Sequence, residues 1–356
     1  MPNYASIEIC AGAGGQALGL HNAGFKHTVL VEIDKSACET LMLNNEQHNL
    51  GWGVIREGCV QHFAEHEAHL YQGIDLVAGG VPCPPFSKAG KQLGKDDERD
   101  LFPAAIEIVR KVFPKAVMIE NVSGLLDPKF SEYREEINNV FANMGYTTFW
   151  KLHNASHYGV PQLRPRVILV ALRGEYAQHF QWPNYRIEPP TVGEALYDLM
   201  ASTGWAGAED WKFKANKIAP TLVGGSKKHG GPDLGPTRAR RAWQDLHVNG
   251  TCVGNEPPGK GFTGYINRAG VQKDGFENMP LLTVRMAARI QGFPDWWQFS
   301  GKKTAAYRQV GNAFPPPVAE AVGKQIYKAL EAIDTRQSFE QQSLFDIADS
   351  QLLRIA

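Results

Sequence analysis

Three features that would place this chain in a familiar class are missing from its sequence. The five cysteines form no C-x-x-C pair and have no disulfide-scaffold spacing, which favours a reducing compartment. No apolar run approaches the roughly 20 residues of a membrane span, and no targeting segment opens the chain. Lys plus Arg and Asp plus Glu both number 37, so any surface for a polyanion has to be local. We expect a soluble, cytoplasmic protein with no membrane partner.

The first half of the chain alternates between short apolar runs and helical patterns. A chain of 356 residues is long enough for two lobes, at roughly 150 residues per domain. Strands are predicted at residues 6–11, 27–31, 74–78, 116–119 and 167–172, and an apolar-periodic helix at 101–112. This alternation predicts the α/β class, with a Rossmann-like, doubly wound parallel sheet covered by helices on both faces.

A glycine-rich turn follows the first predicted strand. Gly12, Gly14 and Gly15 precede a helix, so a ligand can approach the backbone and the helix N-terminus there. Glu32 ends the second predicted strand about 20 residues later, where doubly wound folds bind the hydroxyls of a ribose. NAD, FAD and S-adenosylmethionine sites share this pattern, and a structural turn with a solvated acid is the simpler alternative.

Cys83 lies between prolines on a stiff loop after the apolar run at 75–78. Gly79, Gly80 and Pro82 prevent that run from continuing as a strand or a helix. The thiol is thereby presented at the C-terminal edge of a parallel sheet, where ligands of α/β folds bind. A nucleophile is one interpretation, and a buried structural cysteine is the other.

Polar groups accompany two later strands at the same edge. Glu120 and Asn121 follow the strand at 116–119, where a carboxylate can hydrogen-bond a polar heterocycle or cap the next turn. Arg164 and Arg166 precede the strand at 167–172. Residues two apart in an extended stretch face the same side, so both guanidinium groups point together toward an anion. A solvated strand edge is the alternative for this pair.

Five segments, in chain order, resemble the motif set of the DNA cytosine-5 methyltransferases of prokaryotic restriction-modification systems. They are Pro82-Cys83, Glu120-Asn121-Val122, Gln162-x-Arg164-x-Arg166, Arg289-x-Gln291-Gly292-Phe293-Pro294-Asp295 and Gln309-Val310-Gly311-Asn312. The resemblance implies the S-adenosylmethionine-dependent methyltransferase fold with a smaller, irregular target-recognition domain. The implied parts are a catalytic and cofactor-binding domain at 1–173, target recognition at 174–282, a return to the catalytic domain at 283–332 with a helix at 315–330, and a C-terminal tail at 333–356.

The same resemblance implies methyl transfer from S-adenosyl-L-methionine to carbon 5 of a flipped-out cytosine in duplex DNA. Carbon 5 is a poor nucleophile until a thiolate adds to carbon 6, which is the role implied for Cys83. Glu120 is expected to neutralise the charge that develops on the ring, and Arg164 and Arg166 to hold the base's carbonyl oxygen and the adjacent phosphate. The residues expected at the cofactor are Cys10, Ala11, Gly12, Gly14, Gly15, Glu32, Ile33, Cys59, Pro82, Leu101 and Asn312, and Ser87 and Gln162 are expected at DNA.

Three positions depart from that family's pattern. Cys10 stands where the family has a Phe stacked on adenine, and Cys59 where it has an Asp that accepts from the adenine amine. Met286 stands where the family tends to have a Glu that supports the scaffold between the lobes. Because Glu32, the glycine turn and Asn312 remain, S-adenosylmethionine is still the expected cofactor.

The middle segment is expected to be irregular, because four tryptophans alternate with Gly/Pro-rich stretches. It also carries a local basic patch, which suits phosphate contacts and groove entry. The DNA-contacting residues expected here are Ser226, Lys227, Lys228, His229, Arg238, Arg240 and Arg241. A solvated loop is the alternative.

One group of residues has metal-ligand character. Cys59, His62, His66 and His69 recur at helical spacing, which a zinc site also uses. Acidic residues within the same stretch favour a solvated helix with surface histidines, and the implied chemistry needs no metal. We therefore expect no metal.

Two other functions stay open. A cytosine-5 methyltransferase acting on transfer RNA would share the chemistry, but the long middle segment argues against it. A nicotinamide-dependent oxidoreductase would use the unit at 12–32, but it leaves Cys83, Glu120 and the arginine pair unexplained. We expect double-stranded DNA as the partner, functional pairing with a restriction endonuclease without a stable complex, and a monomer.

Overall fold

A seven-stranded sheet forms the centre of the computed structural model, which describes residues 3–82, 100–224, 232–266 and 272–352, without side chains after 336. The strand order is β3-β2-β1-β4-β5-β7-β6. The bounds are β1 Ala5–Ile9, β2 Lys26–Glu32, β3 Val54–Glu57, β4 Leu76–Gly79, β5 Ala116–Val122, β6 Tyr146–Asn154 and β7 Pro165–Arg173. Six predicted site residues, Cys83, Ser87, Ser226, Lys227, Lys228 and His229, lie outside the described residues.

The predicted parallel sheet holds for five of the seven strands. β3, β2, β1, β4 and β5 run parallel, whereas β7 is antiparallel to both β5 and β6. Parallel neighbours need a crossover connection, usually a helix, but β6 and β7 are joined by only residues 155–164. A short connection of this kind favours an antiparallel hairpin, and β6 was not among the predicted strands.

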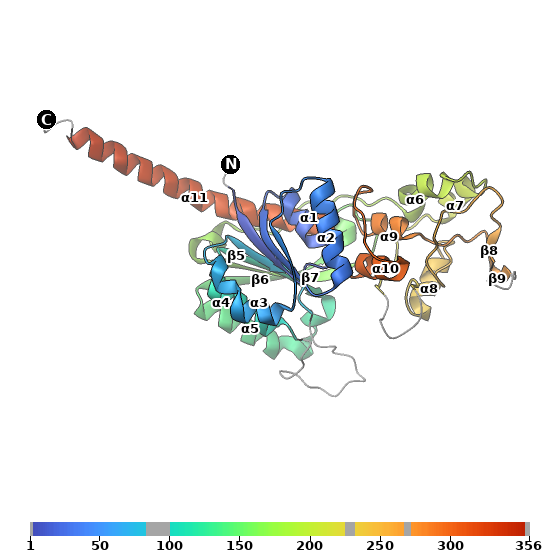
Figure 1. Cartoon of the computed structure of the whole chain (residues 1–356), viewed down its shortest axis with the longest axis horizontal. Coiled ribbons are helices and arrows are strands. Elements are labelled where there is room, and N and C mark those ends of the chain that lie inside the picture. Colours follow the sequence, from blue (N-terminus) through green and yellow to red (C-terminus); the bar gives the residue numbers. More distant parts are fainter. Residues whose placement is uncertain (1–2, 83–99, 225–231, 267–271, 353–356) are drawn as a thin grey trace.

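Helices cover both faces of the sheet, as the strand-helix alternation predicts (Figure 1). Val117 and Ile119 of β5 pack on one face, whereas Ala116 and Met118 belong to the core of the other, the two-residue period of a strand. One face is covered by α3 Val60–His66, α4 Phe102–Val112 and α5 Ser131–Asn143, and the other by α1 Gly15–Asn22 and α11 Pro316–Leu352. The remaining helix of this lobe is α2 Lys35–Gln47.

The middle segment contains more regular structure than its composition predicts. Its elements are α6 Val192–Ala201, α7 Ala208–Lys214, α8 Thr237–Gln244 and the hairpin of β8 Gly264–Ile266 with β9 Gln272–Glu277. Trp205, Trp211 and Trp243 are buried at its centre. The indole nitrogens of Trp205 and Trp211 donate to the carbonyls of Phe262 and His247. Three tryptophans therefore supply the core that the Gly/Pro-rich stretches cannot.

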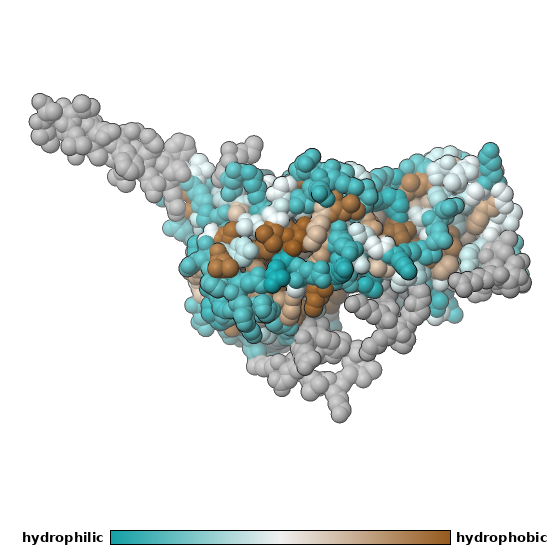
Figure 2. All heavy atoms as spheres, viewed as in Figure 1, coloured by the Kyte–Doolittle hydropathy of each residue, from teal (hydrophilic) through white to brown (hydrophobic). Residues whose placement is uncertain are grey.

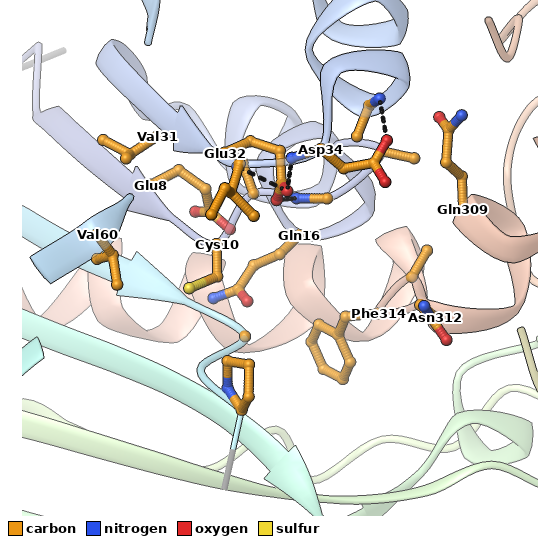
Figure 3. Close-up of a pocket in the computed structure, with 18 of the residues that line it drawn as sticks. Glu8, Cys10, Gln16, Val31, Glu32, Asp34, Val60, Gln309, Asn312 and Phe314 are labelled. Atoms are coloured by element: carbon orange, nitrogen blue, oxygen red, sulfur yellow. Dashed lines mark hydrogen bonds between the residues drawn. The ribbon is translucent and has the colours of Figure 1, made fainter. Parts of the chain in front are cut away.

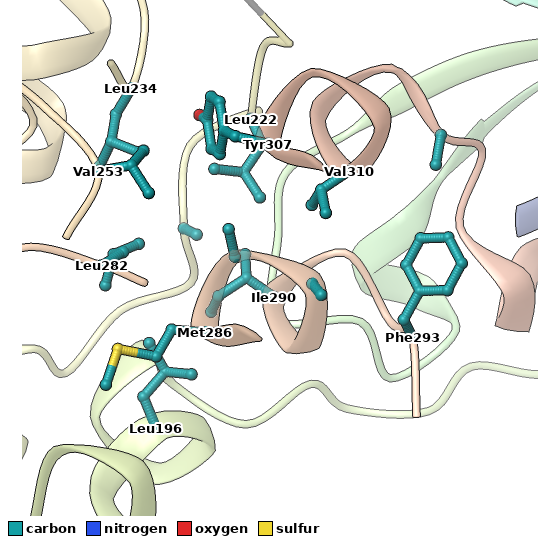
Figure 4. Packing of buried hydrophobic residues seen from close by; sticks show 14 of the residues in the cluster. Leu196, Leu222, Leu234, Val253, Leu282, Met286, Ile290, Phe293, Tyr307 and Val310 are labelled. Atoms are coloured by element: carbon teal, nitrogen blue, oxygen red, sulfur yellow. The ribbon is translucent and has the colours of Figure 1, made fainter. Parts of the chain in front are cut away.

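Two helices after the middle segment join the lobes. They are α9 Val284–Ile290 and α10 Lys303–Asn312. Figure 4 shows Met286 and Ile290 of α9 and Tyr307 and Val310 of α10 in the cluster that contains Leu222, Leu234 and Val253 of the middle segment. The same cluster includes buried residues of α1 and α2. The chain that returns after residue 282 thus packs with the middle segment through α9 and α10, and Phe314 and α11 then pack on the sheet.

The C-terminal helix is longer than the predicted stretch at 315–330. α11 continues to Leu352 and projects away from the sheet in Figure 1, where a tail was predicted after residue 332. Lys115 anchors the helix, because its ammonium lies 2.6 Å from Asp334 and 2.9 Å from Asp75. The phenol of Tyr176 donates to Asp334 as well.

Hydrophilic residues cover most of the face in Figure 2, and hydrophobic side chains gather in a band along its middle. In the part of the chain that the structure describes, no helix is both long and apolar enough to cross a membrane.

A helical glycine is required where α1 contacts α11. A Cβ at Gly19 would lie 2.4 Å from the carbonyl oxygen of Pro316 and 2.5 Å from the Cβ of Ala319. We expect Gly19→Ala to lower the free energy of unfolding by about 1–3 kcal/mol, the usual effect of overpacking. Helix propensity alone would raise it by about 1 kcal/mol. Urea denaturation measures the change.

Gly261→Ala is the matched control, because no atom lies within 4 Å of a Cβ built there and the residue is exposed. Its free energy of unfolding should stay near that of the wild type. Gly19→Ala at or above wild-type stability would contradict the close packing of α1 on α11.

Candidate active site

A cavity opens at the C-terminal edge of the sheet, where β1, β2, β4 and β5 end. Ligands of doubly wound sheets bind at this edge. We call it the first cavity; Figure 3 shows Glu32 and Cys10 from the strand ends and Asn312 and Phe314 from the end of α10 and the residues after it. All residues predicted at the cofactor line this cavity except Gly14, whose neighbours on both sides do.

The glycine turn is built for close approach. Gly12 has a φ of +54°, and no atom lies within 4 Å of a Cβ built on it, so this position stays open toward the cavity. Gly14 and Gly15 serve packing instead. A Cβ on Gly14 would meet Leu41 at 2.7 Å, and one on Gly15 would meet the carbonyl oxygen of Phe314 at 2.1 Å.

Glu32 is held rigidly at the end of β2. Its carboxylate accepts from the backbone N–H groups of Gly12, Ile33 and Asp34 at 2.7, 2.8 and 2.7 Å. A carboxylate has about four lone-pair sites, so the side chain keeps capacity to accept from a hydroxyl in the cavity. Asp34 in turn pairs with Arg308 of α10 at 3.0 Å, which joins this edge to the second lobe.

Two side chains on the cavity wall carry oxygen atoms that have no partner within the described residues. Both carboxyl oxygens of Glu8 and the amide oxygen of Gln16 are buried and unpaired. Burial raises the pKa of the Glu8 carboxyl well above its usual range. The Cys10 thiol beside them is also held neutral, because burial raises its pKa, and Glu32 and Glu8 raise it further.

A second cavity adjoins the first around Glu120. It is lined by residues of β5, β7, the segment 221–224 and the end of α10. Gly80, Pro82, Glu120 and Asn312 line both cavities. A group bound in one cavity can therefore reach a group bound in the other at this junction.

Glu120 and Arg166 form an ion pair at the junction. The guanidinium Nε of Arg166 lies 2.8 Å from Glu120 Oε1, and both side chains are largely buried. Burial raises the pKa of Glu120, while Arg166 and then Arg164 oppose that rise. A carboxyl whose pKa is raised above its usual range can donate a proton as well as accept one.

The described residues on either side of the segment 83–99 meet at this junction. The Leu101 N–H donates to the Pro82 carbonyl at 3.2 Å, so the described residues on either side of 83–99 are joined. The Asn121 side chain donates to the Val81 carbonyl at 2.9 Å. Gly80 lies close beside it, because a Cβ there would be 3.1 Å from Glu120 Oε2 and would press on that carboxyl. Cys83 itself is outside the described residues and follows Pro82 directly.

Gln162 and Arg164 do not reach the surface. Gln162 donates to Gln291 and to the Ile290 carbonyl and accepts from the Leu222 N–H, and it is fully buried. The contact of Gln162 with DNA stays a prediction, and in this arrangement the residue is buried. Its amide is already used between the lobes.

Arg164 likewise donates to backbone rather than to an open site. Its guanidinium bonds the carbonyls of Leu222 at 2.8 Å and Gly311 at 2.9 Å, and only 1% of the residue is exposed. Of the predicted pair, Arg166 contacts Glu120 and Arg164 contacts the two carbonyls, and both arginines line the second cavity. We call Gln162, Arg164 and Gln291 the buried hub.

The three arginines predicted to contact DNA from the middle segment lie on α8. Arg238 and Arg241 are exposed, and Arg240 is half-buried. They lie outside both cavities.

The histidine-rich stretch forms α3 and the turn after it. The rings of His62 and His66 stack at 4.5 Å, and more than half of each side chain is exposed. Among the described residues, no three His, Cys, Asp or Glu side chains form a group that could hold a metal ion.

Several cavity residues have no counterpart among the predicted ones. Glu8, Gln16, Gln61 and the Asp34–Arg308 pair line the first cavity. The partners Asp34 and Arg308 are 274 residues apart in the chain, so no local pattern reveals them. Glu8 did carry a signal, because a charged residue in the middle of a buried strand is unusual.

Comparisons with known proteins agree on one family. The model for the C-5 cytosine-specific DNA methylases matches residues 4–328. A Type II methyltransferase of Neisseria gonorrhoeae, M.NgoMIV, is 56% identical, over 92% of this chain and 98% of the relative. M.NaeI of Lentzea aerocolonigenes, also a Type II methyltransferase, is 52% identical, over 93% and 76%. The methyltransferase EhMeth of Entamoeba histolytica shares the fold, with a TM-score of 0.63 at 16% identity, over 93% of this chain and 99% of the other.

The buried Glu8 makes stability depend on pH. A carboxyl with a raised folded-state pKa stabilises the protein below its unfolded pKa, and this contribution is lost as pH rises through the folded pKa. Glu8→Gln does not titrate. We therefore expect Glu8→Gln to gain stability relative to the wild type as the pH rises from 4.5 to 8. The difference between the urea midpoints of the variant and the wild type, taken at each pH, measures this change.

Glu39→Gln is the control, because Glu39 is exposed and forms no ion pair among the described residues. Its difference from the wild type should not change between the two pH values. A pH-independent difference for Glu8→Gln would mean that Glu8 is ionised in the folded protein.

Proposed function

The chain belongs to the C-5 cytosine-specific DNA methylase family, and from this premise we propose that it methylates carbon 5 of a flipped-out cytosine in duplex DNA. We propose S-adenosyl-L-methionine as the methyl donor, in the first cavity, and the target base in the second. The observation that carries the proposal is the Glu120–Arg166 pair at the junction, next to the Pro82 that precedes Cys83.

The lining of the first cavity fits an adenosyl cofactor. Glu32 keeps acceptor capacity for ribose hydroxyls, and Gly12 leaves the backbone open. Gln16 presents an unpaired acceptor, and the neutral Glu8 carboxyl presents an unpaired donor and acceptor, which suits a polar ligand. When bound, S-adenosylmethionine supplies an electrophilic methyl group; the residues around it bind and orient.

The second cavity would hold the cytosine and activate it. The Cys83 sulfur forms a bond to carbon 6, and the ring electrons shift onto carbon 5 while Glu120 shares a proton with ring nitrogen 3. Arg166 orients the Glu120 carboxyl through their ion pair. Once carbon 5 has taken the methyl group, its proton leaves to a base, the electron pair re-forms the ring double bond, and the carbon–sulfur bond breaks.

Arg164 acts differently in this proposal from what the motif alone implies. A guanidinium that donates to the Leu222 and Gly311 carbonyls positions the cavity wall rather than a phosphate. Leu222 and Gly311 both line the second cavity, so loss of Arg164 would loosen the base site.

We further propose that the enzyme modifies a specific site in a restriction-modification system, with the middle segment as the target-recognition region. The relatives M.NgoMIV and M.NaeI are Type II methyltransferases, which supports this role. Arg238, Arg240 and Arg241 of α8, with residues 226–229, are the proposed DNA contacts. Pairing with an endonuclease without a stable complex, and a monomeric enzyme, complete the proposal.

Cys83→Ser should abolish methyl transfer and leave DNA binding intact, because a serine hydroxyl is not ionised near neutral pH but no binding surface changes. Tritium transfer from labelled S-adenosylmethionine to duplex DNA measures methyl transfer, and a gel mobility shift measures DNA binding. Transfer RNA serves as the competing substrate. Robust turnover by the serine variant would remove the nucleophile assignment.

DNA with 5-fluorocytosine at the target should trap the wild-type enzyme covalently, since fluorine cannot leave carbon 5 as a proton does. The adduct should survive a denaturing gel, and Cys83→Ser should form none. A wild-type enzyme that methylates normal DNA but forms no adduct with the fluorinated base would count against the addition step.

Lys227→Ala/Lys228→Ala should weaken DNA binding and flatten its dependence on salt. Each phosphate contact contributes a slope of about 0.9 in log K against log salt, so two lost contacts lower the slope by about 1.8. Lys26→Ala/Lys328→Ala removes the same charge from exposed positions outside both cavities and should keep the slope. Equal slopes for the two double variants would exclude the 226–229 stretch from the interface.

A further inference from the structure

A cysteine and a glutamine form a polar pair on the wall of the first cavity. The Cys59 thiol donates to the amide oxygen of Gln61 over 2.6 Å, and both residues line the cavity. Cys59 stands at the N-terminal end of α3, yet its side chain makes no capping hydrogen bond. Its thiol is turned to the glutamine instead, and the Gln61 amide nitrogen has no hydrogen-bond partner among the described residues.

The order of the strands locates this pair relative to the reacting end of the cavity. Glu120 lies near the end of β5, Glu32 ends β2, and Cys59 and Gln61 follow β3 at the outer edge of the sheet. Neighbouring strands are about 4.8 Å apart, so the pair lies roughly 19 Å along the edge from Glu120. A ligand that reacts at the Glu120 junction and places its ribose at Glu32 therefore has its base beside Cys59 and Gln61.

The surroundings of the pair suit a flat heterocycle. Ile33 is 71% exposed, which is unusual for a large apolar side chain, and it lines the cavity together with the buried Val60. Leu101 adds a further apolar contact surface. A ring lying among these side chains would be covered on its faces and would leave its polar edge to be read by the nearest hydrogen-bonding group.

We propose that Gln61, oriented by Cys59, recognises the adenine of the cofactor and sets its base specificity. The amide nitrogen donates to ring nitrogen 1, and the amide oxygen accepts from the exocyclic amine with its second lone pair, the first being used by the thiol. This inference rests on the proposed use of S-adenosylmethionine. It accounts for the absence of a carboxylate at position 59, because the accepting group is supplied two residues later.

The thiol has a separate task in this arrangement. A glutamine amide can turn by 180° and exchange its oxygen and nitrogen. The turned amide would match a hypoxanthine ring, which has a carbonyl in place of the amine and a hydrogen on nitrogen 1. The Cys59 S–H disfavours that turn, because the thiol would then face the NH2 group, and a thiol sulfur accepts a hydrogen bond only weakly. The pair therefore reads adenine, whereas a free glutamine would accept either base.

Calorimetric binding of S-adenosylhomocysteine and its inosine analogue, S-inosylhomocysteine, tests the proposal without any turnover. The wild type should bind the adenine compound about tenfold or more tightly, the scale of two exchanged hydrogen bonds. Gln61→Leu should weaken binding of the adenine compound by about tenfold and bring the two affinities together. Gln72→Leu, at an exposed position outside the cavity, is the matched control and should bind as the wild type does.

Two variants of Cys59 test the orienting role separately from the fold. Cys59→Ala allows the Gln61 amide to turn. The ratio of the two affinities should therefore fall, mainly because the inosine compound binds more tightly. Cys59→Ser places a hydroxyl there, which can donate to the amide oxygen or accept from the NH2 group, so the preference should narrow as it does in Cys59→Ala. Wild-type preference in both Gln61→Leu and Cys59→Ala would overturn this inference and leave the proposed function standing. A wild-type protein that binds neither compound nor S-adenosylmethionine would overturn the proposed function, and the inference with it.

Discussion

The buried guanidinium of Arg164 is the constraint on which the arrangement of the site depends. A buried charge is tolerated only where hydrogen bonds replace its water, and here two backbone carbonyls from different parts of the chain do so. Burial lowers the pKa of Arg164 to about 9, which reflects the cost of keeping it charged. Leu222 and Gly311 must stay in place to meet that cost.

Gln162 and Gln291 extend this constraint across both lobes. Gln162 is bonded to Leu222 and Gln291, and the Gln291 side chain donates to the Ala313 carbonyl. The hub thus fixes the entry to β7, the end of α9 and the end of α10 at one place. Asn312, which lines both cavities, lies between Gly311 and Ala313 and is positioned by the same bonds.

Three carboxylates at one sheet edge have three different tasks because their environments differ. Glu32 accepts three backbone N–H groups and stays an acceptor for the ribose in our proposal. Glu120 is buried but paired with Arg166, so it can share a proton. Glu8 is buried with no partner among the described residues and favours the neutral form. Proximity to the cavity alone would not have distinguished them.

Local sequence determined those features that depend on neighbouring residues. The glycine turn, Glu32 at a strand end, the proline-flanked Cys83 and the Glu120-Asn121 pair follow from strand ends and turn chemistry, and five strands were predicted on that basis. Tertiary structure decided what depends on distant contacts: the antiparallel β6–β7 hairpin, the continuation of α11 to Leu352, and the different partners of Arg164 and Arg166. Two arginines at alternate positions look equivalent in sequence. Folding brings the backbone carbonyls of Leu222 and Gly311 to Arg164, which is buried against them. Arg166 pairs with Glu120 instead.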